Sequence, residues 1–175
     1  YSSEWDFYKN RNNWRISSIK ELMKKYIVIP RACNWTGKST KKIKIGRYDI
    51  NFNTFLKFFG IWISEGCTTQ TGTRKFVVVS QSPLSKYYSD IKSLFNELKI
   101  KYIQCRSGKT VQFRIEDAEF YNYFKIFGKS GDKYIPKVIK EATPESLRLF
   151  LDWILITTLW RRTKLQKITK AIFIP

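Results

Sequence analysis

The stretch Phe55–Cys67 reads FLKFFGIWISEGC, and it decides the fold of this 175-residue chain. Its large apolar residues are spread nearly all round a helix, which predicts a helix that is buried on most sides. Asn51 or Asn53 is a suitable N-cap, and the helix is expected to end at about Glu65, before Gly66. A buried helix with a chance acid before a glycine cap would have the same pattern.

Strand and helix signals alternate after this helix. Thr73–Gln81 contains a β-branched run that predicts a central strand. Ser82-Pro83 predicts the start of a helix, with serine as the N-cap and proline in the first turn. The inner stripe of that helix is expected to contain Leu84, Tyr87, Ile91, Leu94, Phe95 and Leu98.

Two further helices are predicted towards the C-terminus. Glu119–Phe127 is expected to form a helix that ends at Gly128, and Thr143-Pro144 supplies the cap and first turn of the next one. The order helix, strands, helix, strands, helix and then a second apolar helix is typical of an α+β fold.

A hairpin is predicted from Tyr102–Arg106 and Thr110–Ile115, which are joined through residues 107–109. Alternation with period two predicts one apolar face and one polar face on this ribbon. The apolar face would contain Val111, Phe113 and Ile115, and the polar face would contain Gln104, Arg106, Gln112 and Arg114. Gln and Arg are side chains that read base edges and phosphates, although a solvent-facing amphipathic hairpin would have the same pattern.

The net charge points to a polyanionic partner. Lys and Arg number 33 against 14 Asp and Glu, which gives +19 at neutral pH. The alternative is an ordinary basic domain. No apolar run approaches the roughly 20 residues that a membrane span needs, so nucleic acid is favoured over lipid.

The histidine and cysteine content limits the kinds of catalytic and metal site that this chain can form. Histidine is absent, which excludes Cys/His zinc sites and every nuclease that uses histidine as its general base. The three cysteines, Cys33, Cys67 and Cys105, are odd in number and far apart, which favours a reducing, intracellular compartment. No secretory signal is visible.

The N-terminal residues 1–50 are polar and basic and are interpreted as an extension or linker. Ser18–Tyr26 is a predicted helix with a capping box. Arg31–Arg47 is expected to form a cationic loop or ragged hairpin that contacts phosphate, or else a solvated linker.

The segment Phe58–Gly66 resembles the LAGLIDADG motif of homing endonucleases, in the variant that ends in an acid and a glycine. The resemblance implies a helix-strand-strand-helix-strand-strand-helix repeat with a curved antiparallel DNA-binding sheet. Two motif helices would pack side by side, with Gly60 and Ser64 at their contact. Glu65 would then bind Mg²⁺ or another divalent cation that activates water for phosphodiester hydrolysis.

Arg148–Thr158 stands where a second motif would begin, 93 positions (153 − 60) after the first. Thr158 replaces the metal-binding acid, Leu159 the glycine and Trp153 the small residue at the helix contact. Asp152 lies six residues before Thr158, on a different part of the helix, and is not a simple substitute. Weak or absent double-strand cleavage by a lone chain is therefore expected.

The resemblance also implies the site residues and the domain bounds. Glu65, Gln81 and Lys133 would be catalytic, with Gln81 orienting water and Lys133 stabilising the transition state. Residues 51–142 would form the first repeat and residues 143–175 the start of a truncated or degenerate second one. The expected nucleic-acid-binding residues are Arg74, Lys75, Gln104, Arg106, Lys109, Gln112 and Arg114.

Three functions are consistent with these residues. The first is a sequence-specific homing endonuclease of the kind carried by introns or inteins, acting on double-stranded DNA and completed by a homodimer or by another chain. The second is a catalytically inactive DNA- or RNA-binding module on the same scaffold, such as an RNA maturase. The third is a basic ribosome-associated or virion-packaged structural protein, which would not distinguish among DNA sequences.

Overall fold

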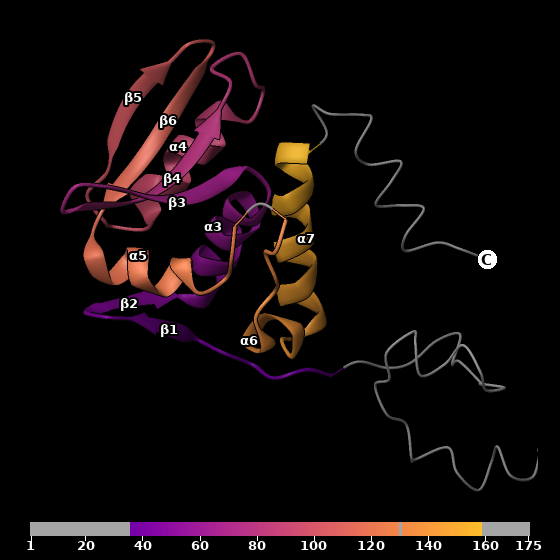
Figure 1. Ribbon diagram of the computed structural model, residues 1–175. Helices are drawn as coiled ribbons and strands as arrows, with labels where there is room; N and C mark the ends of the chain where they lie inside the picture. The colour runs from indigo at the N-terminus through magenta and orange to yellow at the C-terminus, as the bar shows by residue number, and fades with distance from the viewer. Residues whose placement is uncertain (1–35, 130, 159–175) are drawn as a thin grey trace, which may run out of the picture. The chain divides into compact units, whose positions relative to one another are not determined.

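A computed structural model describes residues 36–129 and 131–158 (Figure 1). Its elements are β1 (Lys42–Ile45), β2 (Tyr48–Asn51), α3 (Phe52–Glu65), β3 (Gly66–Thr71), β4 (Arg74–Gln81), α4 (Tyr88–Glu97), β5 (Ile103–Ser107), β6 (Thr110–Glu116), α5 (Ala118–Lys125), α6 (Lys137–Lys140) and α7 (Pro144–Thr158). The predicted helix at Ser18–Tyr26 lies outside the described residues. From α3 to α7 the α+β order that the motif implies is confirmed, with the short helix α6 added before α7.

Two antiparallel sheets form around α3. The larger has the strand order β3-β4-β6-β5, so the prediction that residues 73–81 form a central strand is confirmed. The smaller is the β1–β2 hairpin; β1 lies within the segment Arg31–Arg47 that was expected to be a loop or ragged hairpin, and β2 follows that segment. Its turn contains Gly46, whose φ of 55° favours glycine.

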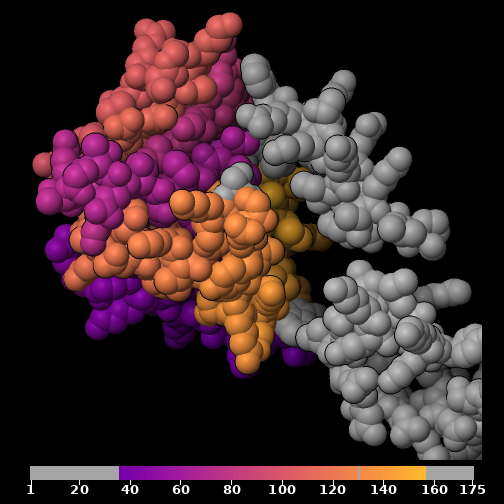
Figure 2. Space-filling view, in the orientation of Figure 1, coloured from indigo at the N-terminus to yellow at the C-terminus, as the bar shows by residue number. Residues whose placement is uncertain are grey.

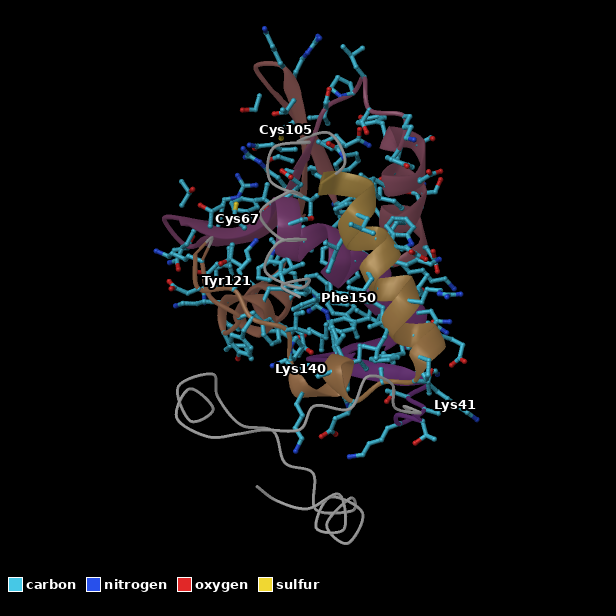
Figure 3. All side chains as sticks on the ribbon, turned by 90° about the vertical axis from the view of Figure 1, so that its right-hand side faces the viewer. Lys41, Cys67, Cys105, Tyr121, Lys140 and Phe150 are labelled. Carbon is cyan, nitrogen blue, oxygen red and sulfur yellow. The ribbon has the colours of Figure 1, made fainter. Side chains whose placement is uncertain are left out.

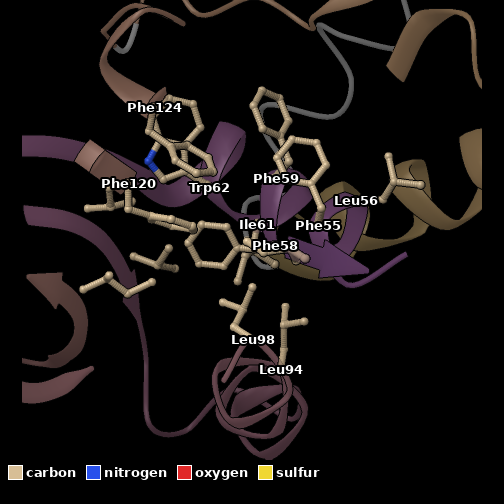
Figure 4. Close-up of a cluster of buried hydrophobic side chains, with 14 of the residues drawn as sticks. Phe55, Leu56, Phe58, Phe59, Ile61, Trp62, Leu94, Leu98, Phe120 and Phe124 are labelled. Atoms are coloured by element: carbon tan, nitrogen blue, oxygen red, sulfur yellow. The ribbon is translucent and has the colours of Figure 1, made fainter. Parts of the chain in front are cut away.

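Helix α3 lies at the centre of the apolar core, as its sequence predicts (Figure 4). The Asn51 side chain caps it by accepting hydrogen bonds from the backbone N–H groups of residues 53 and 54. Phe58 packs edge-on against Phe95 and Phe124, with ring centroids 5.5 and 5.4 Å apart. Such aromatic pairs contribute about 0.5–1.5 kcal/mol each beyond their burial.

Helix α7 runs beside α3 (Figure 1). A Cβ added at Gly60 would lie 3.0 Å from the Cβ of Trp153 and 3.1 Å from the backbone oxygen of Phe150. The close approach expected at Gly60 is therefore confirmed. The Ser64 hydroxyl donates within its own helix, to the carbonyl oxygens of residues 60 and 61 at 3.2 and 3.0 Å.

The predicted start of the fourth helix is wrong. Helix α4 begins at Tyr88, and Ser82 caps only a turn, with its hydroxyl oxygen accepting from the Leu84 N–H at 3.3 Å. Leu84 is 86% exposed, whereas Tyr88 packs against the core. A Ser-Pro pair fits a turn as well as a helix start. The chain between Pro83 and Tyr88 has no continuous apolar face that would favour the helix. The remaining stripe residues, Ile91, Leu94, Phe95 and Leu98, are buried as expected.

The helices expected from residues 119 and 144 are present as α5 and α7. Asp117 caps α5 by accepting from the Phe120 N–H at 2.8 Å. Thr143 caps α7 through the Ser146 N–H at 3.4 Å. Within the described ranges, none of the helices is both long enough and apolar enough to cross a bilayer.

Candidate nucleic-acid interface

The strand register of the larger sheet determines which side chains share a face. Directly paired residues of antiparallel strands point to the same side. Val77 and Val79 face the core, together with their partners Ile115 and Phe113 on β6. We call the opposite side the outer face; it contains Cys67, Thr69, Arg74, Phe76, Val78, Ser80, Ile103, Cys105, Gln112, Arg114 and Glu116.

The prediction that Gln104 and Arg106 share a face with Gln112 and Arg114 is wrong. Gln104 pairs with Phe113 and Arg106 with Val111, so both lie on the core side of the sheet. The Tyr88 hydroxyl of α4 donates to the Gln104 side-chain oxygen at 3.2 Å. Strand β5 is at the sheet edge, where polar side chains reach solvent from either face, and alternation within each strand does not fix the register between strands.

The other expected nucleic-acid-binding residues are also divided. Arg74 lies on the outer face, together with Gln112 and Arg114. Lys75 pairs with Gln70 on the core side, and its ammonium lies 5.8 Å from the ring centroid of Tyr121 in α5. Lys109 is in the β5–β6 turn, where the preceding Gly108 has a φ of 57°.

Hydrogen bonds hold the arginines of the outer face in place. Arg74 donates two hydrogen bonds to the Glu116 carboxylate, both 2.6 Å long. This pairing raises the pKa of Arg74, and the same hydrogen bond lowers the pKa of Glu116. Arg114 donates to the Gln112 side-chain oxygen at 2.6 and 3.1 Å. A bidentate contact of this kind fixes the plane of the guanidinium.

Phe76 lies between these two arginines. Its ring centroid is 5.2 Å from the guanidinium carbon of Arg74 and 6.0 Å from that of Arg114, and the side chain is 5% exposed. The arginines therefore gain cation–π contact as well as hydrogen bonds. The amide group of Gln112 and the remaining N–H groups of Arg114 stay available as donors, and ordered donors of these types can recognise base edges.

Helix α3 ends where the larger sheet begins. Glu65 is the last residue of α3, and Gly66 is the first residue of β3. A Cβ at Gly66 would collide with the Trp62 indole ring, so a glycine is required after the acid. The Gly66 N–H donates to the Trp62 carbonyl oxygen, which closes the helix.

Lys133 caps the C-terminal end of α3. Its ammonium donates to the carbonyl oxygens of Trp62, Ile63 and Gly66 at 2.8, 3.2 and 2.6 Å. It also lies 4.5 Å from the Trp62 ring centroid. Helix C-termini carry unpaired carbonyl groups and partial negative charge, which a cation satisfies. Sequence reasoning selected this lysine as a catalytic residue and missed its contacts with the helix end.

Burial lowers the pKa of Lys133, and its attraction to Cys67 and Glu65 partly opposes that shift. Gln81 is at the same end of the β3–β4 pair, because Gly66 pairs with Val79 and β4 ends two residues later. Its side-chain oxygen accepts the Ser82 N–H at 3.0 Å. The structure brings the three expected catalytic residues to one end of the sheet.

The residues around Glu65 do not form a complete metal site. No group of three or more Asp, Glu, Cys or His side chains that could hold a metal occurs among residues 36–129 and 131–158. The carbonyl groups nearest to Glu65 already bind the ammonium of Lys133. Mg²⁺ often takes one or two carboxylates from a protein and the rest from water and phosphate. Glu65 fits that arrangement as one ligand of a metal shared with bound nucleic acid.

Comparison with solved structures finds similarity to I-DmoI, which is described as a homing endonuclease. A variant of I-DmoI in complex with its target DNA and Mg²⁺ has a TM-score of 0.47 and 13% identity, over 69% of this chain and 75% of that one. The complex of I-DmoI with DNA and Ca²⁺ has a TM-score of 0.47 and 14% identity, over 69% and 70%. These values concern the fold and assign no activity.

A search of protein-family models finds no match. One relative, from Chlamydomonas moewusii, is named as an ATP-dependent Clp protease proteolytic subunit. The two are 23% identical over an alignment of 155 residues, which covers 83% of this chain and 14% of that protein. This chain thus spans about a seventh of its relative, whose activity does not transfer on that basis.

Proposed function

We propose that this chain is a LAGLIDADG-type protein that binds double-stranded DNA on the outer face of its larger sheet. The observation that supports this most directly is the preordered row of Arg74, Gln112 and Arg114. Their side chains are fixed by hydrogen bonds before any ligand arrives. Fixed donors lose little side-chain entropy on binding, which favours recognition of base edges.

The charge of the surrounding chain supports a polyanionic partner. Residues 99–115, which include β5 and most of β6, contain five cations and no acid: Lys99, Lys101, Arg106, Lys109 and Arg114. Lysines of this kind neutralise phosphates without reading sequence, so they would add affinity and a strong dependence on salt. Gln104 and Arg106, on the edge strand β5, would contact the phosphate backbone beyond the sheet edge, and Lys75 would do so from the end of β4 next to the β3–β4 turn.

Glu65 is the acid on which phosphodiester hydrolysis would depend. A divalent metal, when bound, would lower the pKa of water and stabilise the leaving oxygen. In this proposal Glu65 holds that ion, Gln81 orients the water and Lys133 fixes the helix end that carries the carboxylate. The first repeat would extend over residues 51–142 and the second would begin at residue 143.

Thr158, at the end of α7, limits the expected chemistry. A neutral hydroxyl is a weaker ligand for a hard cation than a carboxylate, so the site would have one acid in place of two. We therefore propose DNA binding with weak or absent double-strand cleavage by the lone chain. Robust cutting, as in an intron- or intein-borne homing enzyme, would need a second acid from another copy or another chain.

The test combines a binding titration with a plasmid-cleavage assay in Mg²⁺. In Arg74→Gln/Arg114→Gln, affinity for duplex DNA is expected to fall at least tenfold, because two ordered donors are lost. The matched control Lys92→Gln/Lys129→Gln removes the same charge from exposed positions and is expected to lose less than threefold. Equal losses in both variants would show that net charge, and not the outer face, determines binding.

Cleavage separates the endonuclease from a pure binding module. Any nicking of the plasmid is expected to disappear in Glu65→Gln while DNA affinity is retained. Double-strand cutting that survives this substitution would refute the role of Glu65. Calorimetric titration of the DNA-bound chain with Mg²⁺ gives a second test. A catalytically inactive binding module would show no heat of metal binding.

A further inference from the structure

A second group of cations lies at the far end of α3 from Glu65. Lys41, Lys42 and Lys44 are in or beside β1, and Lys140 ends α6; all four are exposed. We call these four lysines the basal surface. No ion pair involves them within the described part of the chain. Figure 3 places Lys41 and Lys140 at the opposite end from Cys67 and Cys105 of the outer face.

Backbone contacts hold the two parts of the basal surface together. The Lys38 N–H donates to the Glu141 carbonyl oxygen at 2.6 Å, and Lys38 forms a parallel bridge with Ala142. A Cβ at Gly37 would collide with the Ala142 carbonyl, and its φ of 63° also requires glycine. The chain before β1 is thereby fixed against the end of α6, and in Figure 2 the indigo and orange surfaces meet at the lower end.

Two of the acids near this surface are in ion pairs, and a third, Asp49, lies directly opposite Lys44 on β2. Glu141 accepts from Lys38 at 2.8 Å and from Lys137 at 3.4 Å. Asp117 binds Arg47 at 2.6 Å and the hydroxyl of Tyr48 at 2.8 Å. These contacts neutralise the Glu141 and Asp117 carboxylates, and even with Asp49 opposite Lys44 the basal surface keeps a net positive charge.

The alternation of β1 directs two of these lysines away from the core. Ile45 is buried and Ile43 packs against the core, so Lys42 and Lys44 lie on the other side of the hairpin. Their Cα atoms are about 7 Å apart, as expected for positions i and i+2 of a strand. Lysine carries a mobile point charge, whereas arginine carries a planar guanidinium fork. A mobile point charge suits contact with phosphate and not recognition of bases.

The basal surface lacks the apolar groups that a membrane-binding surface would need. Among the described residues, the large hydrophobic side chains that are exposed all lie outside residues 36–51 and 137–142: Leu84, Ile103, Ile126, Tyr134, Leu151 and Leu155. Surfaces that bind lipid usually combine cations with such side chains. A hydrated phosphodiester backbone is the polyanion that fits lysines alone.

We propose that the basal surface is a second, sequence-independent nucleic-acid-binding site. Helix α3 has 14 residues and is about 21 Å long, so it separates this site from the Glu65 end of the sheet. A nucleic-acid segment that lies flat on the outer face does not reach the basal lysines. The protein therefore holds two nucleic-acid segments at once, one recognised through base edges and the other through phosphates.

A bridging assay tests this site. A DNA duplex of about 20 base pairs is immobilised and saturated with the full chain, and a fluorescent duplex of unrelated DNA or RNA is then added. The wild-type chain is expected to capture the second duplex. Lys41→Gln/Lys42→Gln/Lys44→Gln/Lys140→Gln is expected to bind the first duplex within threefold of wild type and to capture the second at least tenfold more weakly.

The matched control neutralises four other exposed lysines, Lys86, Lys92, Lys125 and Lys129, and is expected to keep bridging. Bridging that persists in the basal variant overturns the proposal and points to pairing of two chains through their outer faces. Absent bridging by the wild type, or equal loss in the control, also overturns it. The variant Lys41→Gln/Lys140→Gln leaves both strands unchanged and is expected to capture the second duplex two- to fivefold more weakly, without risk to the hairpin.

These outcomes are independent of the outer face. The Arg74→Gln/Arg114→Gln variant tests capture of the first duplex, whereas the basal variant tests only the second. For the second duplex, loss of four phosphate contacts is expected to reduce the slope of log affinity against log salt by about three to four. An unchanged slope would show that the lysines do not touch phosphate.

Discussion

Helices α3 and α7 pack side by side, yet the protein covers them very differently. Helix α3 is buried from Phe52 to Trp62 except at Asn53 and Lys57. Helix α7 buries Phe150 against α3 but leaves Leu151 53% and Leu155 41% exposed. Each helix buries the side that contacts the other, while among the described residues only α3 is enclosed by a sheet and further helices.

The ends of the two helices differ as well. Helix α3 ends in Glu65-Gly66, with Lys133 on its terminal carbonyl groups. Helix α7 ends at Thr158, without an acid in the corresponding position. The packing between α3 and α7 therefore does not depend on a matched pair of acids, so the proposed DNA binding and the proposed chemistry can be tested by separate substitutions.

The largest expected effect concerns the contact between the helices. Gly60→Val places atoms against the Trp153 Cβ and the Phe150 carbonyl, where even a Cβ would be tight. Overpacking of this kind costs about 3 kcal/mol, which urea denaturation would measure. Gly131→Val is the control, because its Cβ meets nothing within 4 Å. A loss below about 0.5 kcal/mol at Gly60 would mean that the helices are not in close contact.

The next effect concerns the cap of α3. Lys133→Met keeps the length of the side chain but removes the donor from three carbonyl groups. Hydrogen bonds from charged groups contribute about 1.5–3 kcal/mol, so a loss of about 2 kcal/mol is expected. Lys129→Met, on an exposed side chain, is the control. An unchanged stability of the Lys133 variant would restrict this lysine to a role in catalysis.

A smaller gain is expected from restoring an acid to α7. Thr158→Glu gives the second helix the terminal carboxylate that the first already has, which would add a ligand for a shared divalent cation. Plasmid nicking in Mg²⁺ is expected to rise about tenfold, or about 1.4 kcal/mol in the barrier. The double variant Glu65→Gln/Thr158→Glu should lose that gain. No change in nicking would indicate that the missing acid is not what limits cleavage.

The sequence predicted the parts of this comparison that depend on local pattern. The apolar residues of α3, its Asn51 cap and the close contact at Gly60 follow from spacing and residue size. The start of α4 was misplaced because Ser82-Pro83 is compatible with a turn. The face of Gln104 depends on the pairing of β5 with β6, and the cap at Lys133 joins residues 71 positions apart. Neither relation is encoded in a local pattern.

The smallest effect concerns the side of α3 that faces α5. Tyr123 packs edge-on against Phe55, with centroids 6.1 Å apart, and burial raises its pKa to about 12. The folded state then holds this proton more tightly than the unfolded state, whose tyrosines titrate near 10. Stability is complete below about pH 10 and falls as the pH rises from 10 towards 12.

Tyr123→Phe removes this dependence while it keeps the ring against Phe55. The stabilities of the variant and the wild type are expected to be similar at pH 8, and the variant should become the more stable of the two by pH 11. Ultraviolet titration of the folded wild type and of the variant gives an independent measure, since the variant is expected to lose a late tyrosinate component that the wild type has. A tyrosine titration without that late component would mean that α5 does not enclose α3. The difference in burial between α3 and α7 would then not hold on the side of α3 that faces α5.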